Sequence, residues 1–165
     1  MLHLTRFNLE NISRGVIGLP LSLDFKSGDK IIINGAVIEN SGPNSKLSVH
    51  NQAAILRGKE VLSEEDSNTP ASRVYYALQC AYIFPQFTAE YIRSFTEYLE
   101  EYLRACPSAQ PIADEINPFI ENGELYKGLK TAQKLIEHER DLLHSLDIDI
   151  KEALDDDPEL LGNSE

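Results

Sequence analysis

The hydrophobic period of this chain changes once, near residue 67, and this change constrains the fold more than any other feature. Before it, apolar and polar residues alternate in short runs separated by turn residues, which is the pattern of β-strands. After it, apolar residues recur every three or four positions, which is the pattern of amphipathic helices. The sequence therefore predicts an α+β fold: a small N-terminal antiparallel β unit followed by a C-terminal bundle of about four helices and an acidic tail.

Residues 19–66 are expected to form about five short antiparallel strands. Apolar and polar residues alternate strictly over residues 21–25, as in a half-buried strand. The pair Asn34-Gly35 separates two apolar runs and favours a type I′ turn, because both central positions of that turn need a positive φ. Further short strands are expected within residues 47–56. The open edges of such a unit would suit a homodimer.

Residues 67–146 are expected to form the helical region. Thr69 and Pro70 combine an N-cap residue with proline at the first helical position. A second helix is expected over residues 88–105, with tyrosines and leucines on one face and glutamates opposite. Pro118 should kink or divide the short helix that follows, and a last helix should begin near residue 124.

The two ends of the chain are expected to lie outside both regions. Residues 1–18 show no sustained period, and we expect either a disordered leader or a start codon assigned too early, with Val16 as the true start. Residues 147–165 contain eight acids and one lysine, and we expect a mostly disordered acidic tail.

The charge of the chain is divided as clearly as its period. The net charge is −12; residues 1–60 hold seven Lys/Arg and five Asp/Glu, a net of +2, so residues 61–165 carry −14. Acidic surfaces repel nucleic acid, so only the front portion could bind it. Its candidate RNA-binding residues are Lys26, Lys30, Lys46, Arg57 and Lys59. The alternative is that these five are scattered charges that only promote solubility.

Motifs for catalysis, cofactor binding or metal binding are not found. The phosphate-binding patterns GxxxxGK[ST] and GxGxxG are absent. His138 and His144 are six residues apart, so they do not form the i, i+4 pair of a helical metal site. His138 and acidic neighbours such as Glu139 are expected to form a solvated helix face. Cys80 and Cys106 lack CxxC spacing and are expected to be reduced thiols in the core. We therefore expect a protein that is not an enzyme and uses no cofactor.

The apolar segments suggest a cytoplasmic protein rather than a membrane protein. No window approaches the ~20 apolar residues of a membrane span, and no secretory signal is evident.

Tyrosine is common at protein interfaces because its large ring carries one polar tip. The candidate partner-binding residues on the expected helices are Tyr75, Tyr82, Tyr91 and Tyr98.

Three blocks, in order along the chain, resemble the FlbT family of bacterial flagellin regulators. TPASRVYYALQCAYI (69–83) is similar to its Thr-Pro-x-x-Arg/Lys-x-Tyr-Phe/Tyr-x-x-Gln pattern. LDFKSGDKIIINGAVIEN (23–40) is similar to its Gly-Glu-x-Ile-Ile-x-Asn-Gly opening, and ENGELYKGLKTAQKLIEHERDLL (121–143) to its Gly-x-Tyr-x-Ala-Leu-Lys block. Gly128 departs from the alanine that the family favours.

The resemblance implies a post-transcriptional repressor of flagellin synthesis. Such a protein would bind the 5′ untranslated region of flagellin mRNA, promote decay of the message, and work with flagellin and the flagellar protein FlaF. A weaker similarity, to the carbon storage regulator family, makes Arg57 the nearest equivalent of an RNA-contacting arginine on a terminal strand. The alternative is a protein-binding adaptor or assembly factor that acts on flagellin or FlaF without touching RNA.

Overall fold

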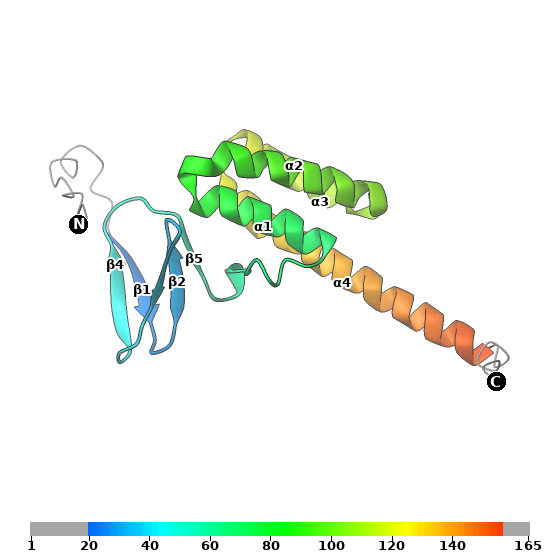
Figure 1. Ribbon diagram of the computed structural model, residues 1–165, viewed down its shortest axis with the longest axis horizontal. Coiled ribbons are helices and arrows are strands. Elements are labelled where there is room, and N and C mark those ends of the chain that lie inside the picture. The colour runs from blue at the N-terminus through cyan, green and yellow to red at the C-terminus, as the bar shows by residue number, and fades with distance from the viewer. Residues whose placement is uncertain (1–19, 157–165) are drawn as a thin grey trace, which may run out of the picture. The chain divides into compact units, whose positions relative to one another are not determined.

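The computed structural model describes residues 20–156, which form five strands in two small sheets followed by four α-helices (Figure 1). The predicted α+β class is confirmed. The strands are β1 (Leu21–Phe25), β2 (Lys30–Ile33), β3 (Ala36–Glu39), β4 (Ser45–Val49) and β5 (Ile55–Arg57). The α-helices are α1 (Pro70–Ile83), α2 (Thr88–Ala105), α3 (Gln110–Glu121) and α4 (Leu125–Asp156), and the 3-10 helices are η2 (Gly58–Glu60), η3 (Pro85–Phe87) and η4 (Pro107–Ala109). The expected leader at residues 1–18 and residues 157–165 of the expected tail lie outside this description.

Contacts divide the described chain into two compact units. The first unit contains β1 and β4, and the second contains β2, β5, most of β3 and all four α-helices. The predicted strands are thus present, but they form two sheets, and three of them belong with helices that follow residue 66. Strand partners depend on pairing between distant segments, which the order of strands along the chain does not determine.

The first unit is a two-stranded antiparallel ladder with one half-buried face. Its register places Leu23 opposite Leu47. The side chain of Asn40 ties the unit together: its Nδ2 donates to the carbonyl oxygen of Phe25 at 2.8 Å, and its Oδ1 accepts the N–H of Gly42 at 3.0 Å. This asparagine replaces backbone pairing where the chain turns toward β4.

The turn between β2 and β3 has the two positive φ angles predicted for Asn34-Gly35, at 48° and 82°. The Asn34 side chain accepts the N–H of Ala54 at 2.9 Å, and the Asn34 N–H donates to the Ala54 carbonyl oxygen at 2.9 Å. A Cβ placed on Gly35 would lie 2.5 Å from a ring carbon of Phe84, at the end of α1. This position therefore needs glycine both for its backbone angle and for its close contact with the helix.

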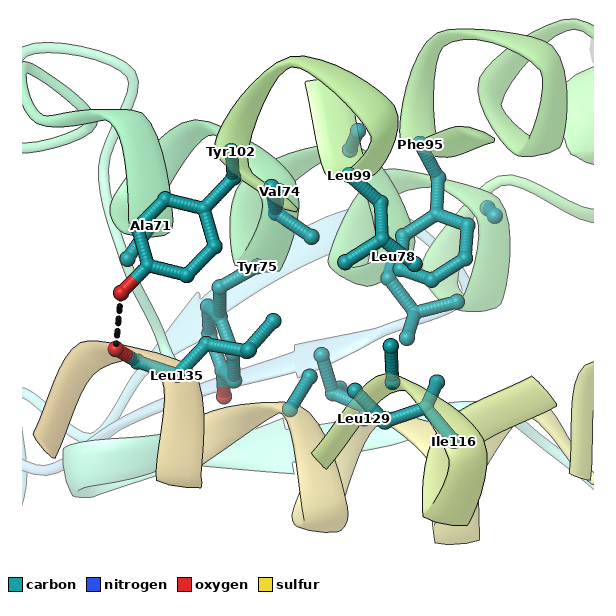
Figure 2. Close-up of a cluster of buried hydrophobic side chains, with 14 of the residues drawn as sticks. Ala71, Val74, Tyr75, Leu78, Phe95, Leu99, Tyr102, Ile116, Leu129 and Leu135 are labelled. Atoms are coloured by element: carbon teal, nitrogen blue, oxygen red, sulfur yellow. Dashed lines mark hydrogen bonds between the residues drawn. The ribbon is translucent and has the colours of Figure 1, made fainter. Parts of the chain in front are cut away.

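The core of the second unit is built around α1 (Figure 2). Side chains of α1 such as Leu78 lie between those of α2 on one side and those of α3 and α4 on the other. Leu56 of β5 is fully buried in the same core, and Ile32, which faces it in the ladder, packs against that core. The helices therefore hold the three-stranded sheet by one of its faces.

The starts of α1 and α2 lie where the local signals predicted them. Thr69 is the N-cap of α1, and its Oγ1 accepts the N–H of Ser72 while the Ser72 hydroxyl accepts the N–H of Thr69. Pro70 occupies the first helical position, and α2 spans the predicted residues 88–105. The signals that mark these starts come from neighbouring residues, so the sequence is sufficient to find them.

The last two helices differ from expectation. Pro118 lies in the last turn of α3 and does not divide the helix. α4 continues to Asp156, so the first part of the expected tail is helical. Leu146, Ile150 and Leu154 extend the four-residue apolar spacing through this acidic segment. None of the helices within residues 20–156 is long and apolar enough to span a membrane.

Candidate nucleic-acid interface

The five candidate cations are all exposed and are divided between the two units. Lys26 and Lys46 belong to the first unit, and the other three belong to the second. In the second unit Ile31 pairs with Arg57, so Lys30 and Arg57 lie at the same end of the β2–β5 ladder. Lys59 follows in η2. The structure therefore brings Lys30, Arg57 and Lys59 to one end of one sheet.

The two groups differ in their acidic surroundings. In the first unit Lys46 is directly opposite Asp24 in the ladder, and the backbone N–H of Lys26 donates to the Asp29 carboxylate at 2.9 Å. In the second unit, within the part of the chain that the structure describes, Arg57 and Lys59 have no ion-pair partner. Unpaired exposed cations are the groups that bind phosphate most readily, so Arg57 and Lys59 are the strongest candidates.

The segment that follows Arg57 is held against α1 by two buried polar side chains. The Gln79 amide accepts the N–H of Leu62 at 2.8 Å and donates to the Leu62 carbonyl oxygen at 2.8 Å. The Tyr75 hydroxyl donates to the carbonyl oxygen of Glu60 at 2.7 Å. Thr69, Tyr75 and Gln79, which belong to the TPASRVYYALQ block, thus cap α1 or fasten η2 to it. These bonds restrain the backbone of Glu60 and Leu62, which closely follow Arg57 and Lys59.

A second group of residues meets this segment from α4, and sequence reasoning did not select it. The Tyr126 hydroxyl donates to Oε1 of Glu60 at 2.7 Å, and the Lys130 ammonium donates to the same oxygen at 3.2 Å. Tyr126 is 41% exposed, and its ring centroid lies 5.5 Å from that of Tyr82. Tyr126 and Lys130 are four residues apart on one helix face in the Gly-x-Tyr block, and that spacing was the available signal.

The bond to Glu60 raises the pKa of Tyr126 to about 12, because ionisation would lose the bond and place two negative charges together, and burial adds to the effect. We expect Glu60→Gln to move the ionisation of one tyrosine back toward the ordinary value of 10.0. Ultraviolet absorbance of tyrosinate between pH 9 and 13 measures this shift. Tyr126→Phe is the control: it should remove one phenol from the titration, and Glu60→Gln should then have only a smaller effect, because the Glu60 charge also raises the pKa of Tyr75. An unchanged titration in the single Glu60→Gln variant would refute the bond.

The same bond links stability to pH. The folded pKa of Tyr126 is above the unfolded value, so its contribution is complete below pH 10 and is lost as the pH rises toward 12. Burial likewise raises the pKa of Tyr75 to about 12. Ionisation of either tyrosine at high pH therefore destabilises the folded state.

The four tyrosines predicted to bind a partner differ in exposure. Tyr75 is buried, with 2% of its surface exposed, so its ring belongs to the core. Tyr82 is half-buried, and its hydroxyl accepts the N–H of Ile55 at 3.2 Å. Tyr91 is half-buried against Phe84, whereas Tyr98 is 38% exposed on α2. Partner binding stays a prediction, and Tyr98 is the most accessible of the four.

The expectation of a solvated face around His138 is wrong for two of its residues. Glu139 accepts hydrogen bonds from the Thr69 hydroxyl and the Ala71 N–H, so a residue of α4 completes the N-terminal cap of α1. His138 is bonded through Nδ1 to the Tyr102 hydroxyl at 2.8 Å and through Nε2 to the Ser108 hydroxyl at 2.9 Å. Glu139 therefore links α4 to the start of α1, and His138 links α4 to α2 and η4. Among the described residues, no group of three or more His, Cys, Asp or Glu could hold a metal.

The family model described as "Flagellar protein FlbT" matches residues 21–143, three quarters of the chain. The chain belongs to the FlbT family. The match runs from β1 into α4, so it includes the candidate cations of both units together with Tyr126 and Lys130. The resemblance drawn from the three sequence blocks is confirmed.

Individual FlbT relatives match a similar share of this chain. The "Probable flagellum biosynthesis repressor protein FlbT 1" of Bradyrhizobium diazoefficiens is 35% identical over 125 residues, which are 75% of this chain and 85% of the relative. A "Probable flagellum biosynthesis repressor protein FlbT" of Rhodopseudomonas palustris is 32% identical over 76% of this chain and 98% of the relative. The "Flagellum biosynthesis repressor protein FlbT" of Caulobacter vibrioides is 29% identical over 76% and 90%. No solved structure matches the chain.

Proposed function

We propose that this FlbT-family chain acts in the cytoplasm as a post-transcriptional repressor of flagellin synthesis. It binds the 5′ untranslated region of flagellin mRNA, limits translation and promotes decay of the message. The names of its relatives, which are flagellum biosynthesis repressors, support the repressor role. The observation that carries direct RNA binding is the pair Arg57 and Lys59, exposed at the end of β5 without acidic partners among the described residues.

The position of this pair suits a moderate, salt-sensitive interaction. Arg57 is the last residue of β5 and follows the fully buried Leu56. Lys59 precedes Glu60 and Leu62, which Tyr75 and Gln79 bind to α1. The backbone next to Arg57 and Lys59 is therefore placed before RNA arrives, which lowers the entropy lost on binding. A few phosphate contacts give an affinity that falls as salt rises.

A variant with Arg57→Ala and Lys59→Ala should bind labelled flagellin leader RNA about tenfold more weakly at low salt, because two phosphate contacts are lost. The slope of log affinity against log salt should become shallower by about 1.4, since each contact to a single strand contributes about 0.7. Fluorescence anisotropy across a salt series measures both quantities.

The matched control removes the same number of positive charges from another part of the protein. Lys134 and Arg140 are exposed cations of α4 paired with Glu115 and Asp141. Replacing both with alanine also removes two positive charges, and RNA affinity should stay within about twofold of the parent. Equal losses in the two double variants, or no loss in the first, would contradict the assignment of Arg57 and Lys59.

The second candidate function is a protein-binding adaptor for flagellin or FlaF, with an indirect effect on the message. It is favoured by Leu143 and Leu146, which are 58% and 55% exposed on the acidic part of α4. Purified protein mixed with leader RNA alone separates the two functions. Direct binding supports the repressor that contacts RNA, whereas binding that needs added flagellin supports the adaptor.

A further inference from the structure

Glu60 follows one group of exposed residues along the chain and bonds through its carboxylate to another that is far away in sequence. One is the pair Arg57 and Lys59, within three residues of Glu60 along the chain. The other is the first part of α4, from which Tyr126 and Lys130 both reach Oε1 of Glu60. All of these residues belong to the second unit. We call Tyr126, Lys127 and Lys130 of α4, together with Glu60 of η2, the Tyr126 patch.

The Tyr126 ring has the properties of a stacking platform. Tyr126 is 41% exposed, so part of this residue is open to solvent. Its hydroxyl is held by Glu60, and its ring lies beside that of Tyr82, whose own hydroxyl accepts the Ile55 N–H at 3.2 Å. An aromatic ring held at both ends loses little freedom when a base stacks on it.

The charges around the ring are cations restrained by carboxylates. Lys130 is paired with Glu60 at 3.2 Å, and Lys127 is paired with Glu124 at 2.6 Å. Both lysines are about half exposed or more. An incoming phosphate would meet ammonium groups that already hold an anion, so Glu60 occupies the place that a phosphate oxygen would take.

We propose that the Tyr126 patch binds one nucleotide of single-stranded RNA, with an unpaired base stacked on Tyr126 and its phosphate on Lys130 in place of the Glu60 carboxylate. The inference rests on the proposed function and adds a base-contacting residue to the phosphate contacts of Arg57 and Lys59. Aromatic rings beside cations are the usual means of binding single strands. RNA recognition commonly uses unpaired bases that stack in this way.

The test compares three replacements of Tyr126 by fluorescence anisotropy with flagellin leader RNA and with a short oligouridylate. Tyr126→Leu removes the ring and should weaken binding of both RNAs by roughly tenfold. Tyr126→Phe and Tyr126→Trp keep an aromatic face and should bind within about threefold of the parent or more tightly. The control is Phe87→Leu, which removes an exposed aromatic ring of η3 and should leave affinity unchanged.

A second variant tests the anion and does not alter the ring. Glu60→Gln keeps an acceptor for the Tyr126 hydroxyl but removes the charge that competes with phosphate. RNA affinity should therefore rise, and the gain should shrink as salt increases. A fall in affinity would overturn the competition between Glu60 and phosphate.

Stacking has a spectroscopic signature that a structural role for Tyr126 would not change. An oligouridylate with one 2-aminopurine should lose fluorescence on binding the parent, Tyr126→Phe or Tyr126→Trp, and should lose less on binding Tyr126→Leu. Equal quenching by all variants, or equal affinity of Tyr126→Leu and the parent, overturns the inference.

Failure of the inference can be distinguished from failure of the proposed function. If Tyr126→Leu binds as the parent does while the Arg57/Lys59 double variant binds weakly, the inference falls and the proposed function stands. If the parent protein binds neither RNA, both fall together.

Discussion

Replacing Gln79 by leucine should lower the free energy of unfolding by about 2–3 kcal/mol. Gln79 is buried, with 2% of its surface exposed. Its side-chain amide forms hydrogen bonds of 2.8 Å with both the N–H and the carbonyl oxygen of Leu62. Leucine has a similar size but offers no partner to either group. Each backbone group left unpaired costs about 1–3 kcal/mol, and the apolar surface gained by leucine offsets part of that.

Urea unfolding followed by circular dichroism measures this loss. The control is Gln86→Leu in η3, because Gln86 is exposed and the change should stay within about 0.5 kcal/mol. RNA affinity of the folded Gln79→Leu protein should also fall, because Arg57 and Lys59 precede the segment that Gln79 holds. A variant as stable as the parent would show that the two bonds to Leu62 contribute nothing net.

Gly35→Ala should be destabilising by about 3 kcal/mol, as the sum of two effects. The φ angle of Gly35 is 82°, in the region where a Cβ costs an L-residue about 1–2 kcal/mol. The new Cβ would also lie 2.5 Å and 2.8 Å from two ring carbons of Phe84, and relieving such overlap costs about 1–3 kcal/mol.

Gly58→Ala separates these two effects within the same unit. Gly58 also has a positive φ, 55°, but a Cβ there would have no heavy atom within 4 Å. Its replacement should cost only the backbone penalty, about 1–2 kcal/mol. Thermal unfolding of the two variants gives the difference directly. Equal losses would mean that the Phe84 ring moves aside at no cost.

The parts of the fold that depend on neighbouring residues could be predicted from the sequence. The Thr69-Pro70 start of α1, the full span of α2 and the Asn34-Gly35 turn each follow from the conformation that those residues prefer. The division of five strands into two sheets could not be predicted, because β1 pairs with β4 and β2 with β5 across intervening segments. Several registers bury alternating residues equally well in strands this short.

The candidate site shows the same limit. Charge counting found Arg57 and Lys59, which are exposed, but it could not show that Lys26 and Lys46 belong to another unit. It also missed the Tyr126 patch, because the bond between Glu60 and Tyr126 joins residues 66 positions apart. His138 and Glu139 were assigned to solvent because their partners are on other helices. Long-range polar bonds leave little trace in a single sequence.

The completion of the α1 cap by Glu139 of α4 has a consequence for synthesis. The ribosome releases α1 well before it releases α4, so the nascent helix begins with part of its N-terminal cap missing and with Val74 and Leu78 lacking their α4 neighbours. A product truncated before α4 would display those apolar side chains to chaperones and proteases. The helical unit therefore completes its core and the cap of α1 only after α4 has left the ribosome.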